Sequence, residues 1–244
     1  MKNRDMYQEL GITDKKWQKL LKRAWLFRLI PFVDFVFVAG SMAMGRADEN
    51  SDFDLIVGCR QGRIFTARFS CWVVFNLFGL WARHPAGADN ESNKTNMTNK
   101  TYKSYLSYKD KFCFSHFVTP SAYRLSPPYD NYCQILFSSL VPIYGNREEI
   151  QKFFDANTSW MNSGRMYKSD TRHVNKEKLK IIKMKEWLLN GYFGDLLEKF
   201  LKKIQIKKIE QGLAGVPKYN PRIIFNDNEL EFHPSTKRIE DFCK

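Results

Sequence analysis

The stretch FVFVAGSMAMGRADENSDFDLIVG, residues 35–58, decides what the rest of the chain must form. Two β-prone apolar runs, Phe35–Ala39 and Asp52–Gly58, flank a Gly40–Ser41 turn and the polar loop that follows it. Because side chains alternate along a strand, Asp52 and Asp54 are expected on one face of the second run. The stretch therefore predicts two strands that bring a pair of carboxylates opposite a glycine-serine turn.

This pairing suits chemistry on phosphates. Two carboxylates on one strand face can both ligate a hard divalent cation through oxygen. A Gly-Ser turn offers unobstructed backbone N–H groups and a hydroxyl to a triphosphate. Phosphoryl and nucleotidyl transfer need both parts, because charge builds up on the transferred group and the leaving pyrophosphate must be held.

The motif GSMAMGRADENSDFDLIV, which includes Gly45 and Ser51, resembles the signature of the DNA polymerase β-like nucleotidyltransferase superfamily. That signature is an apolar strand, Gly-Gly or Gly-Ser, a spacer, and Asp-x-Asp or Asp-x-Glu in a second apolar strand. The segments DKFCFSHF, LVPIYGN and FHP are similar to those of short bacterial nucleotidyltransferase-domain proteins. The resemblance implies that Gly40 and Ser41 bind a triphosphate. It also implies that Asp52 and Asp54 ligate two Mg²⁺ ions, with Mn²⁺ able to substitute.

A third carboxylate from a neighbouring strand usually completes the site of this superfamily, as metal ligand and base. The third candidate strand here, Lys111–Thr119, has no acid in its middle. Asp110 at its start, in phase with Phe112, Phe114 and His116, is the candidate for this catalytic and metal-binding role, against a plain turn aspartate. His116 is the alternative, against a packed histidine. If neither serves, the site holds one metal firmly and is slow, or is inactive.

The expected fold class is α+β: a polymerase β-like nucleotidyltransferase core, with a small mixed sheet flanked by helices, and a basic helical C-terminal region. Residues 1–162 are expected to form the core, with an N-terminal helix and a flexible Asn-rich loop near 85–104, and residues 163–244 the basic region and tail. Further expected elements are helices at Asp14–Phe27, Ile64–Trp81, Glu148–Phe154, Lys176–Leu189 and Asp195–Ile209, and a last strand at Arg222–Phe225.

The charge of the chain favours a polyanionic partner. Its 39 Lys and Arg against 26 Asp and Glu leave a net charge of +13, which suits nucleic acid or an anionic membrane surface. Residues 163–209 hold 13 Lys and Arg against 5 Asp and Glu, so they supply +8 of that total. A solvated helical face is the plain interpretation. The alternative is that these helices bind a polynucleotide acceptor, with the candidates Lys180, Lys183, Lys202 and Lys203.

Cysteine use and hydrophobicity favour a cytoplasmic protein. The five cysteines form no C-x-x-C pair and no framework that could pair completely, so reduced thiols are expected. The N-terminus MKNRDMYQEL has no apolar segment typical of a secretory signal. The longest uncharged run, Phe69–Ala82, has 14 residues, fewer than the roughly 20 that cross a bilayer. It predicts a buried helix, against the alternative of a helix at a membrane surface.

Three functions follow from these features. The first is a nucleotidyltransferase that moves a nucleoside monophosphate from an NTP to a hydroxyl of RNA, such as a tRNA end, or of another polynucleotide, without a template and with release of pyrophosphate. The second is a nucleotidyltransferase that modifies a protein or a small molecule, as toxin and resistance members do. The third is a non-catalytic nucleotide binder, which the incomplete carboxylate set permits.

Overall fold

The structure, a computed structural model, describes residues 11–82, 109–127, 129, 131–161, 178–213 and 222–233. The Asn-rich segment near 85–104 lies outside these residues. The described helices and strands are α1 (Ile12–Arg23), η1 (Ala24–Leu29), β1 (Val33–Val38), α2 (Gly40–Ala43), β2 (Phe53–Cys59), α3 (Ile64–Leu77), β3 (Phe112–Val118), η3 (Pro120–Ala122), α5 (Asn131–Ser138), β4 (Val141–Gly145), α6 (Arg147–Asn157), α7 (Lys180–Leu188), α8 (Tyr192–Leu213), β5 (Arg222–Phe225) and β6 (Glu229–His233).

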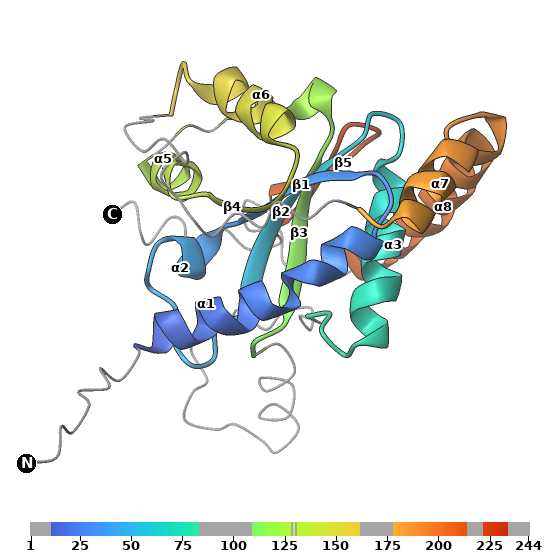
Figure 1. The fold of residues 1–244 in the computed structure, drawn as a ribbon. Coiled ribbons are helices and arrows are strands. Elements are labelled where there is room, and N and C mark those ends of the chain that lie inside the picture. Colours follow the sequence, from blue (N-terminus) through green and yellow to red (C-terminus); the bar gives the residue numbers. More distant parts are fainter. Residues whose placement is uncertain are drawn as a thin grey trace, which may run out of the picture.

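A six-stranded mixed sheet in the order β4-β1-β2-β3-β6-β5 forms the centre of the molecule (Figure 1). The β2–β3 pair is parallel, with α3 in the connection, and the other neighbours are antiparallel. The α+β class is therefore confirmed. Strands β5 and β6 lie within residues 163–244, which the sequence analysis expects to be separate from the core. In the structure they extend the same sheet beyond β3.

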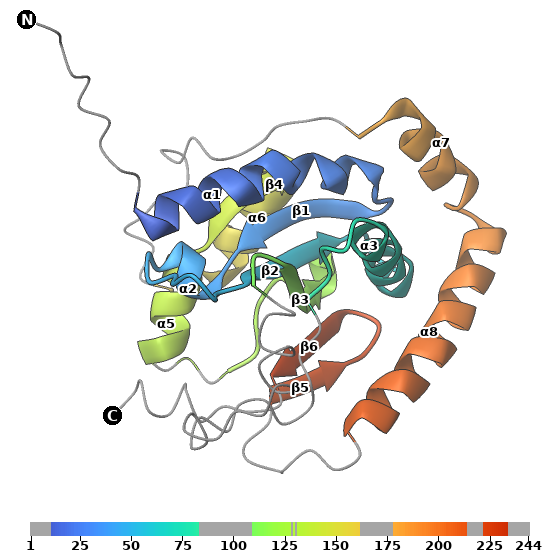
Figure 2. The ribbon, with the colours of Figure 1, turned by 90° about the horizontal axis from the view of Figure 1, so that it is seen from below.

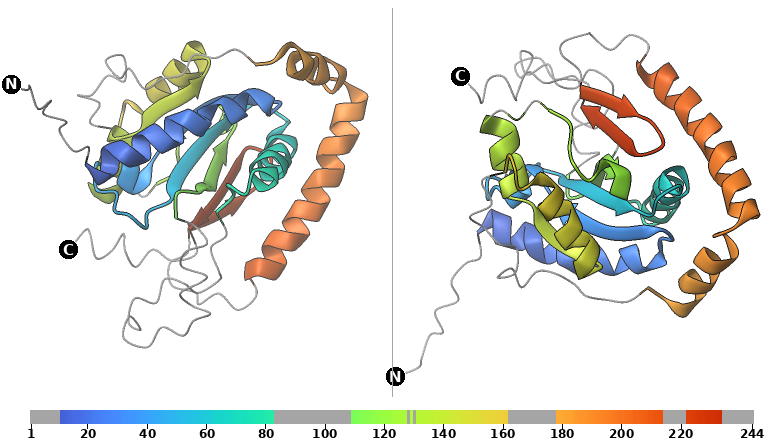
Figure 3. Two further views of the ribbon diagram at one scale, coloured as in Figure 1. Left: turned by 60° about the horizontal axis from the view of Figure 1, so that its bottom comes forward. Right: turned by 90° about the horizontal axis from the view of Figure 1, so that it is seen from above.

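Two apolar layers cover the two faces of the sheet, because the strands alternate. Val38 and Leu55 lie in the larger core cluster with α1, η1 and α3. Phe37 and Ile56 lie in the second cluster with α5 and α6. Figures 1 and 3 show α1 and α6 on opposite sides of the strands. The face that carries Asp54 is the face of Ile56, two residues further along β2.

Strand β3 departs from regular alternation. Its register against β2 shifts after the pair Leu55–Phe114, and the next pair is Ile56–His116. As a result Phe117 packs in the same cluster as Phe114. The prediction that His116 continues the face of Phe112 and Phe114 is therefore wrong, because the bulge at Ser115 changes the phase of the strand.

The first helix ends earlier than predicted. It begins at Ile12 and ends at Arg23, and the chain continues as the 3₁₀ helix η1. A 3₁₀ helix has about three residues per turn, so the apolar positions rotate relative to those of an α-helix. Helical spacing over 14–27 predicts that Trp17, Leu20, Leu21, Ala24 and Trp25 share one apolar face. Trp17, Leu20 and Ala24 are buried, but Trp25 is exposed.

The two C-terminal helices form the outer flank of the molecule (Figures 2 and 3). Helix α8 packs against α3 through buried Leu201 and the partly buried Leu197. Helical periodicity over 195–209 predicts Leu197, Phe200, Leu201 and Ile204 on one side of the helix, but Phe200 and Ile204 are exposed. The reason is angular: at 100° per residue, Phe200 lies about 100° from Leu201, outside the narrow contact with α3.

Two further expectations concern sulfur and membranes. Cys59, Cys71, Cys113 and Cys133 are reduced in the structure, as predicted, and Cys243 lies outside the described residues. Within the described residues, no helix combines the length and the apolar composition that crossing a bilayer requires.

Candidate metal and nucleotide site

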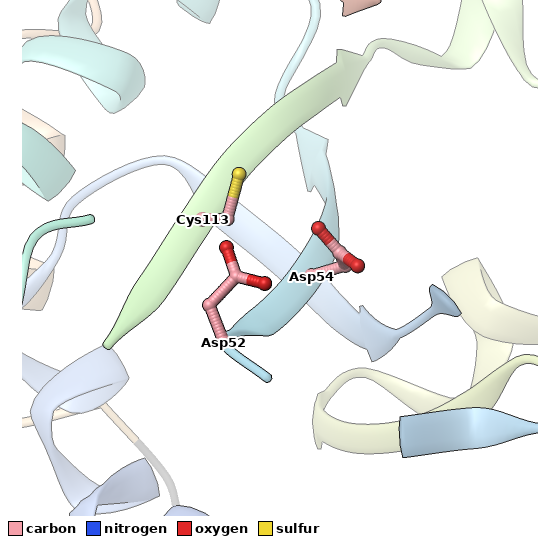
Figure 4. Close-up of side chains that lie close together, drawn as sticks. All are labelled: Asp52, Asp54 and Cys113. Carbon is pink, nitrogen blue, oxygen red and sulfur yellow. The ribbon is translucent and has the colours of Figure 1, made fainter. Parts of the chain in front are cut away.

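Asp52, Asp54 and Cys113 converge at the start of the two parallel strands (Figure 4). Asp52 immediately precedes β2, Asp54 is its second residue, and Cys113 is paired with Asp54 in the register of β3. One ligand atom from each of the three side chains lies within 4.8 Å of the other two. The predicted pairing of the two aspartates on one face is therefore present in the structure.

The Gly40–Ser41 turn approaches this group closely. Gly40 has a φ of +62°, and a Cβ at this position would lie 2.2 Å from Oδ2 of Asp54. The backbone also ties the two strands, since the N–H of Ala39 donates to the carbonyl oxygen of Asp54 at 2.9 Å. Gly40 and Ser41 begin α2, where backbone N–H groups have no acceptor within the helix. The first turn of α2 therefore lies directly beside the Asp54 carboxylate.

Two sets of hydrogen bonds fix the chain immediately before Asp52. Asp48 forms a turn in which its Oδ1 accepts hydrogen bonds from the N–H groups of Asn50 and Ser51, at 2.9 and 2.8 Å. The buried Lys16 donates from Nζ to the carbonyl oxygen of Ser51 at 2.6 Å. The residue before Asp52 is thus fixed on both sides, which positions the first carboxylate.

Asp110 does not join the pair. Its carboxylate lies 2.8 Å from Nζ of Lys16 and 2.5 Å from Nζ of Lys19, both on α1. Burial acts to raise the pKa of Asp110, but the hydrogen bonds and charges of Lys16 and Lys19 outweigh it and lower that pKa. Asp110 has a left-handed φ of +56° and precedes β3, so its side chain is directed at α1 rather than at Asp54. Its structural partner is therefore a lysine pair.

Cys113 lies beside Asp54, on the neighbouring strand from which the resemblance implies a third carboxylate. Burial of the sulfur, and then the charges of Asp54 and Asp52, raise the pKa of the Cys113 thiol well above its usual value. The sequence offered one signal for this position: regular alternation puts Cys113 on the face opposite Phe112 and Phe114, which is the face of the aspartates. The exact neighbour of Asp54 depends on the strand register, which alternation does not specify.

His116 belongs to a different buried group. Its Nε2 lies 3.0 Å from Oε1 of Glu229, and Glu231 is the third member, with ligand atoms of all three within 4.8 Å of one another. Both glutamates are on β6, which sequence reasoning missed. The alternation Glu-Leu-Glu-Phe at 229–232, after the turn residues Asn-Asp-Asn, was the available signal.

The lysines predicted to bind an acceptor lie on α7 and α8. Figures 1 and 2 place these helices on the opposite side of the molecule from α2. Lys180, Lys183 and Lys203 are exposed, whereas Lys202 is paired with Asp227 at 2.6 Å. The structure therefore separates these four lysines from Asp52 and Asp54.

Comparisons with protein-family models, curated proteins and solved structures found no match to this chain. The kind of ion that the site suits is therefore inferred from its ligand atoms. Asp52 and Asp54 offer hard carboxylate oxygens, which Mg²⁺ prefers, and protein Mg²⁺ sites commonly use one or two carboxylates together with substrate phosphates. The Cys113 thiol is a soft donor and suits Mg²⁺ poorly. The two aspartates therefore offer donor atoms of the type that a Mg²⁺ ion requires.

Proposed function

We propose that the protein is a Mg²⁺-dependent nucleotidyltransferase that acts at Asp52 and Asp54. The observation that carries the proposal is the close approach of Gly40 to Asp54, which leaves no space for a side chain between the turn and the carboxylate. A phosphate group bound against the first turn of α2 would therefore lie directly beside the carboxylates and the ion that they would hold. The motif's resemblance to the polymerase β-like superfamily points to the same reaction.

The roles divide between the two parts of the site. Asp52 and Asp54 would hold the ion, which supplies charge neutralisation in an in-line displacement at phosphorus. Gly40 and Ser41 would bind and orient the phosphates that depart as pyrophosphate. No described carboxylate stands beside Asp54 as a third ligand, so this arrangement favours one firmly held ion over two.

We propose a hydroxyl of RNA as the first acceptor to test, because a net charge of +13 favours a polyanion. A hydroxyl of a protein is the alternative. The acceptor must approach the α2 side of the sheet, so lysines on α7 and α8 are not needed for contact with the reacting end. Incubation with each labelled NTP, Mg²⁺ and total RNA, DNA or protein would identify the labelled acceptor.

Substitution of Asp54 tests the proposal directly. Asp54→Asn keeps the shape of the side chain and removes its charge, so transfer should fall about a hundredfold or more, since a bound metal contributes several kcal/mol to such a transition state. The matched control is Asp34→Asn, which changes a carboxylate of β1 outside the site. Circular dichroism establishes that both variants are folded. Equal turnover in Asp54→Asn and wild type would contradict the proposal.

A second candidate function, a non-catalytic Mg²⁺–nucleotide binder, is favoured by Cys113. A thiol beside Asp54 does not supply the base or the additional hard ligand that a carboxylate would. Cys113→Asp separates the two candidates, with Cys113→Ser as the control for size. If the protein is a binder, wild type binds Mg²⁺ and NTP in calorimetry without releasing pyrophosphate, and Cys113→Asp raises the affinity for Mg²⁺. Pyrophosphate release by wild type would exclude this second candidate.

A further inference from the structure

The corner between α7 and α8 presents four large apolar side chains to solvent. Their exposed fractions are 78% for Trp187, 65% for Leu188, 72% for Tyr192 and 74% for Phe193. Single exposed apolar residues are ordinary on a protein surface. Four within seven residues of the chain are not, and a contiguous apolar group of this kind marks a binding surface.

The backbone of this corner is braced against the core. The buried Arg63 donates from Nε to the carbonyl oxygen of Leu189 at 3.2 Å, and its Nη2 lies 2.7 Å from Oδ1 of Asp195. Gly194 packs so closely that a Cβ there would lie 1.8 Å from the same carbonyl oxygen. The four apolar side chains are therefore presented by a fixed turn, which reduces the entropy lost on binding.

The exposed apolar surface continues along both helices from the corner. On α7 it includes Ile181 and Met184, and on α8 it includes Leu196 and Phe200. The spacing of three or four residues puts each set on one side of its helix. We call the corner residues and these four side chains the apolar flank.

Charge is segregated on the same two helices. Three of the four acidic side chains on these helices contact other elements: Glu186 accepts from the N–H of Phe32 at 2.6 Å, Asp195 pairs with Arg63, and Glu198 accepts from the N–H groups of Phe65 and Thr66. The fourth, Glu210, is exposed near the end of α8 that is farther from the corner. Lysines remain on the outside. The exposed ones include Lys180, Lys183, Lys185, Lys199, Lys203 and Lys207. The exposed charged side chains of α7 and of α8 up to Lys207 are therefore lysines, apart from Asp195, which pairs with Arg63.

We propose that the α7–α8 corner docks onto an anionic lipid bilayer, with the apolar flank inserted at the headgroup boundary and the lysines against the lipid phosphates. Amphipathic basic surfaces with Trp, Phe and Leu bind membranes in this way. The aliphatic side chains favour lipid over RNA, because Leu188 and Leu196 gain from acyl chains but cannot form the stacking that nucleic-acid binding uses. A second copy of this chain is a poorer partner for the apolar flank, because a symmetric contact would bring the lysines of both copies together.

Docking by this corner leaves the candidate active site accessible. Figures 1 and 2 show α2 on the far side of the molecule from the corner, so the face of Asp52 and Asp54 would point away from the bilayer. The inference stands apart from the proposed function, because it rests on α7 and α8 and not on the aspartates.

Vesicle flotation tests the proposal with the full chain. Wild type should float with phosphatidylcholine vesicles that contain about 30% phosphatidylserine, and bind pure phosphatidylcholine at least about tenfold more weakly. Trp187→Ser/Phe193→Ser should lose at least about tenfold in affinity for the anionic vesicles. Its control is Ile12→Ser/Ile135→Ser, which replaces exposed apolar residues elsewhere and should bind as wild type does.

The charge contribution has its own pair of variants. Lys185→Gln/Lys199→Gln, beside the corner, should lose about tenfold or more, since each lysine near an anionic surface contributes about 1 kcal/mol. Lys15→Gln/Lys22→Gln on α1 makes the same change in net charge and should have little effect. Insertion is read from tryptophan emission, which should shift to the blue on anionic vesicles and do so much less in Trp187→Phe.

The outcomes are distinguishable. Vesicle binding by wild type that Trp187→Ser/Phe193→Ser retains in full would overturn the proposal, and so would equal binding to neutral vesicles. Failure of wild type to bind vesicles would overturn it as well. In that case, RNA binding lost in Lys185→Gln/Lys199→Gln would assign the flank to a polynucleotide, and concentration-dependent dimers lost in the Trp187 and Phe193 variant would assign it to a second copy.

Discussion

At the scale of single residues, Gly40 has two separate reasons to be glycine. Its φ of +62° is strained for any residue with a Cβ, and its α-carbon faces Oδ2 of Asp54. Gly45 has only the first reason, because its φ is +71° but a Cβ there would meet nothing within 4 Å. The comparison separates backbone strain from the close approach that the candidate site needs.

Gly40→Ala and Gly45→Ala should therefore differ in function more than in stability. Each should lower the free energy of unfolding by about 1 to 2 kcal/mol through backbone strain. In Gly40→Ala the methyl group must also displace the Asp54 carboxylate, so Mg²⁺-dependent nucleotide binding should weaken by about tenfold or more. Urea denaturation and titration calorimetry measure the two effects. Equal nucleotide affinity in the two variants would contradict a role for the close approach.

Asp110 also acts as a single residue, and its role is structural. Because its native pKa lies below the ordinary value of 3.8, the carboxylate stabilises the fold above that pH and loses the contribution as the pH falls through the lowered native pKa. Asp110→Asn should cost about 2 kcal/mol at pH 7, since it leaves the buried Lys16 without its carboxylate. The difference from wild type should shrink below about pH 4.

Urea midpoints at pH 7, 5, 4 and 3 measure this dependence. Glu49→Gln is the control, because the Glu49 carboxylate is exposed and its ion pair with Lys109 is long, at 4.0 Å. Such a surface pair contributes little, so the variant should stay within about 0.5 kcal/mol of wild type. A penalty for Asp110→Asn that persists at pH 3 would indicate a packing effect instead of the ion pair.

At the scale of elements, α8 completes the N-terminus of α3. The residue before α3, Arg63, makes no side-chain cap, and Glu198 of α8 takes over that task. Its two carboxylate oxygens accept from the N–H groups of Phe65 and Thr66 at 2.8 and 2.9 Å. A carboxylate at this place also interacts favourably with the helix dipole. The contact spans more than 130 residues of sequence, so it fixes one helix against another as well as capping it.

Glu198→Ala should lower the free energy of unfolding by about 1 to 3 kcal/mol, because two amides and the Thr66 hydroxyl lose their acceptor. Glu198→Gln keeps one carbonyl oxygen and should cost less. Glu210→Ala removes an exposed carboxylate from the same helix and serves as the control. Thermal unfolding of the three variants measures the order of their stability costs. A cost for Glu198→Ala no larger than for Glu210→Ala would show that α3 does not depend on this cap.

At the scale of the whole molecule, the C-terminal segments are parts of the central sheet and its cover. Strand β6 pairs with β3 along His116–Val118, and Leu230 of β6 is fully buried in the main core. Helix α8 adds Leu201 to the same core. Without these elements β3 would become an exposed edge and α3 would lose its capping partner.

A fragment of residues 1–162 should therefore fail to fold stably on its own, although the sequence suggests this boundary. The full chain should unfold in one cooperative transition. The fragment should show weak dispersion of amide signals in nuclear magnetic resonance and bind a dye for exposed apolar surface. A sharp, cooperative melt of the fragment would instead support two separable units.

Local pattern was sufficient for most elements and for the pair of aspartates. Alternation in 35–38 and 53–58 determines which side chains share a face, and the turn residues Gly40 and Ser41 determine where the chain reverses. The errors arose where an irregularity changed the phase. The bulge at Ser115 moved His116 to the other face, and the 3₁₀ helix η1 moved Trp25 to the surface.

By itself, the sequence determined the composition of the candidate site: two carboxylates two residues apart, and a glycine that tolerates a left-handed turn. Only the tertiary structure decided what stands beside them. Strand register placed Cys113 next to Asp54 and left Asp110 with Lys16 and Lys19. Packing between helices likewise decided which side of α8 contacts α3. It covered Leu201 and left Phe193 and Phe200 exposed. The physical reason is that periodicity defines the faces of one element, whereas neighbours are chosen by packing and pairing between elements distant in the chain.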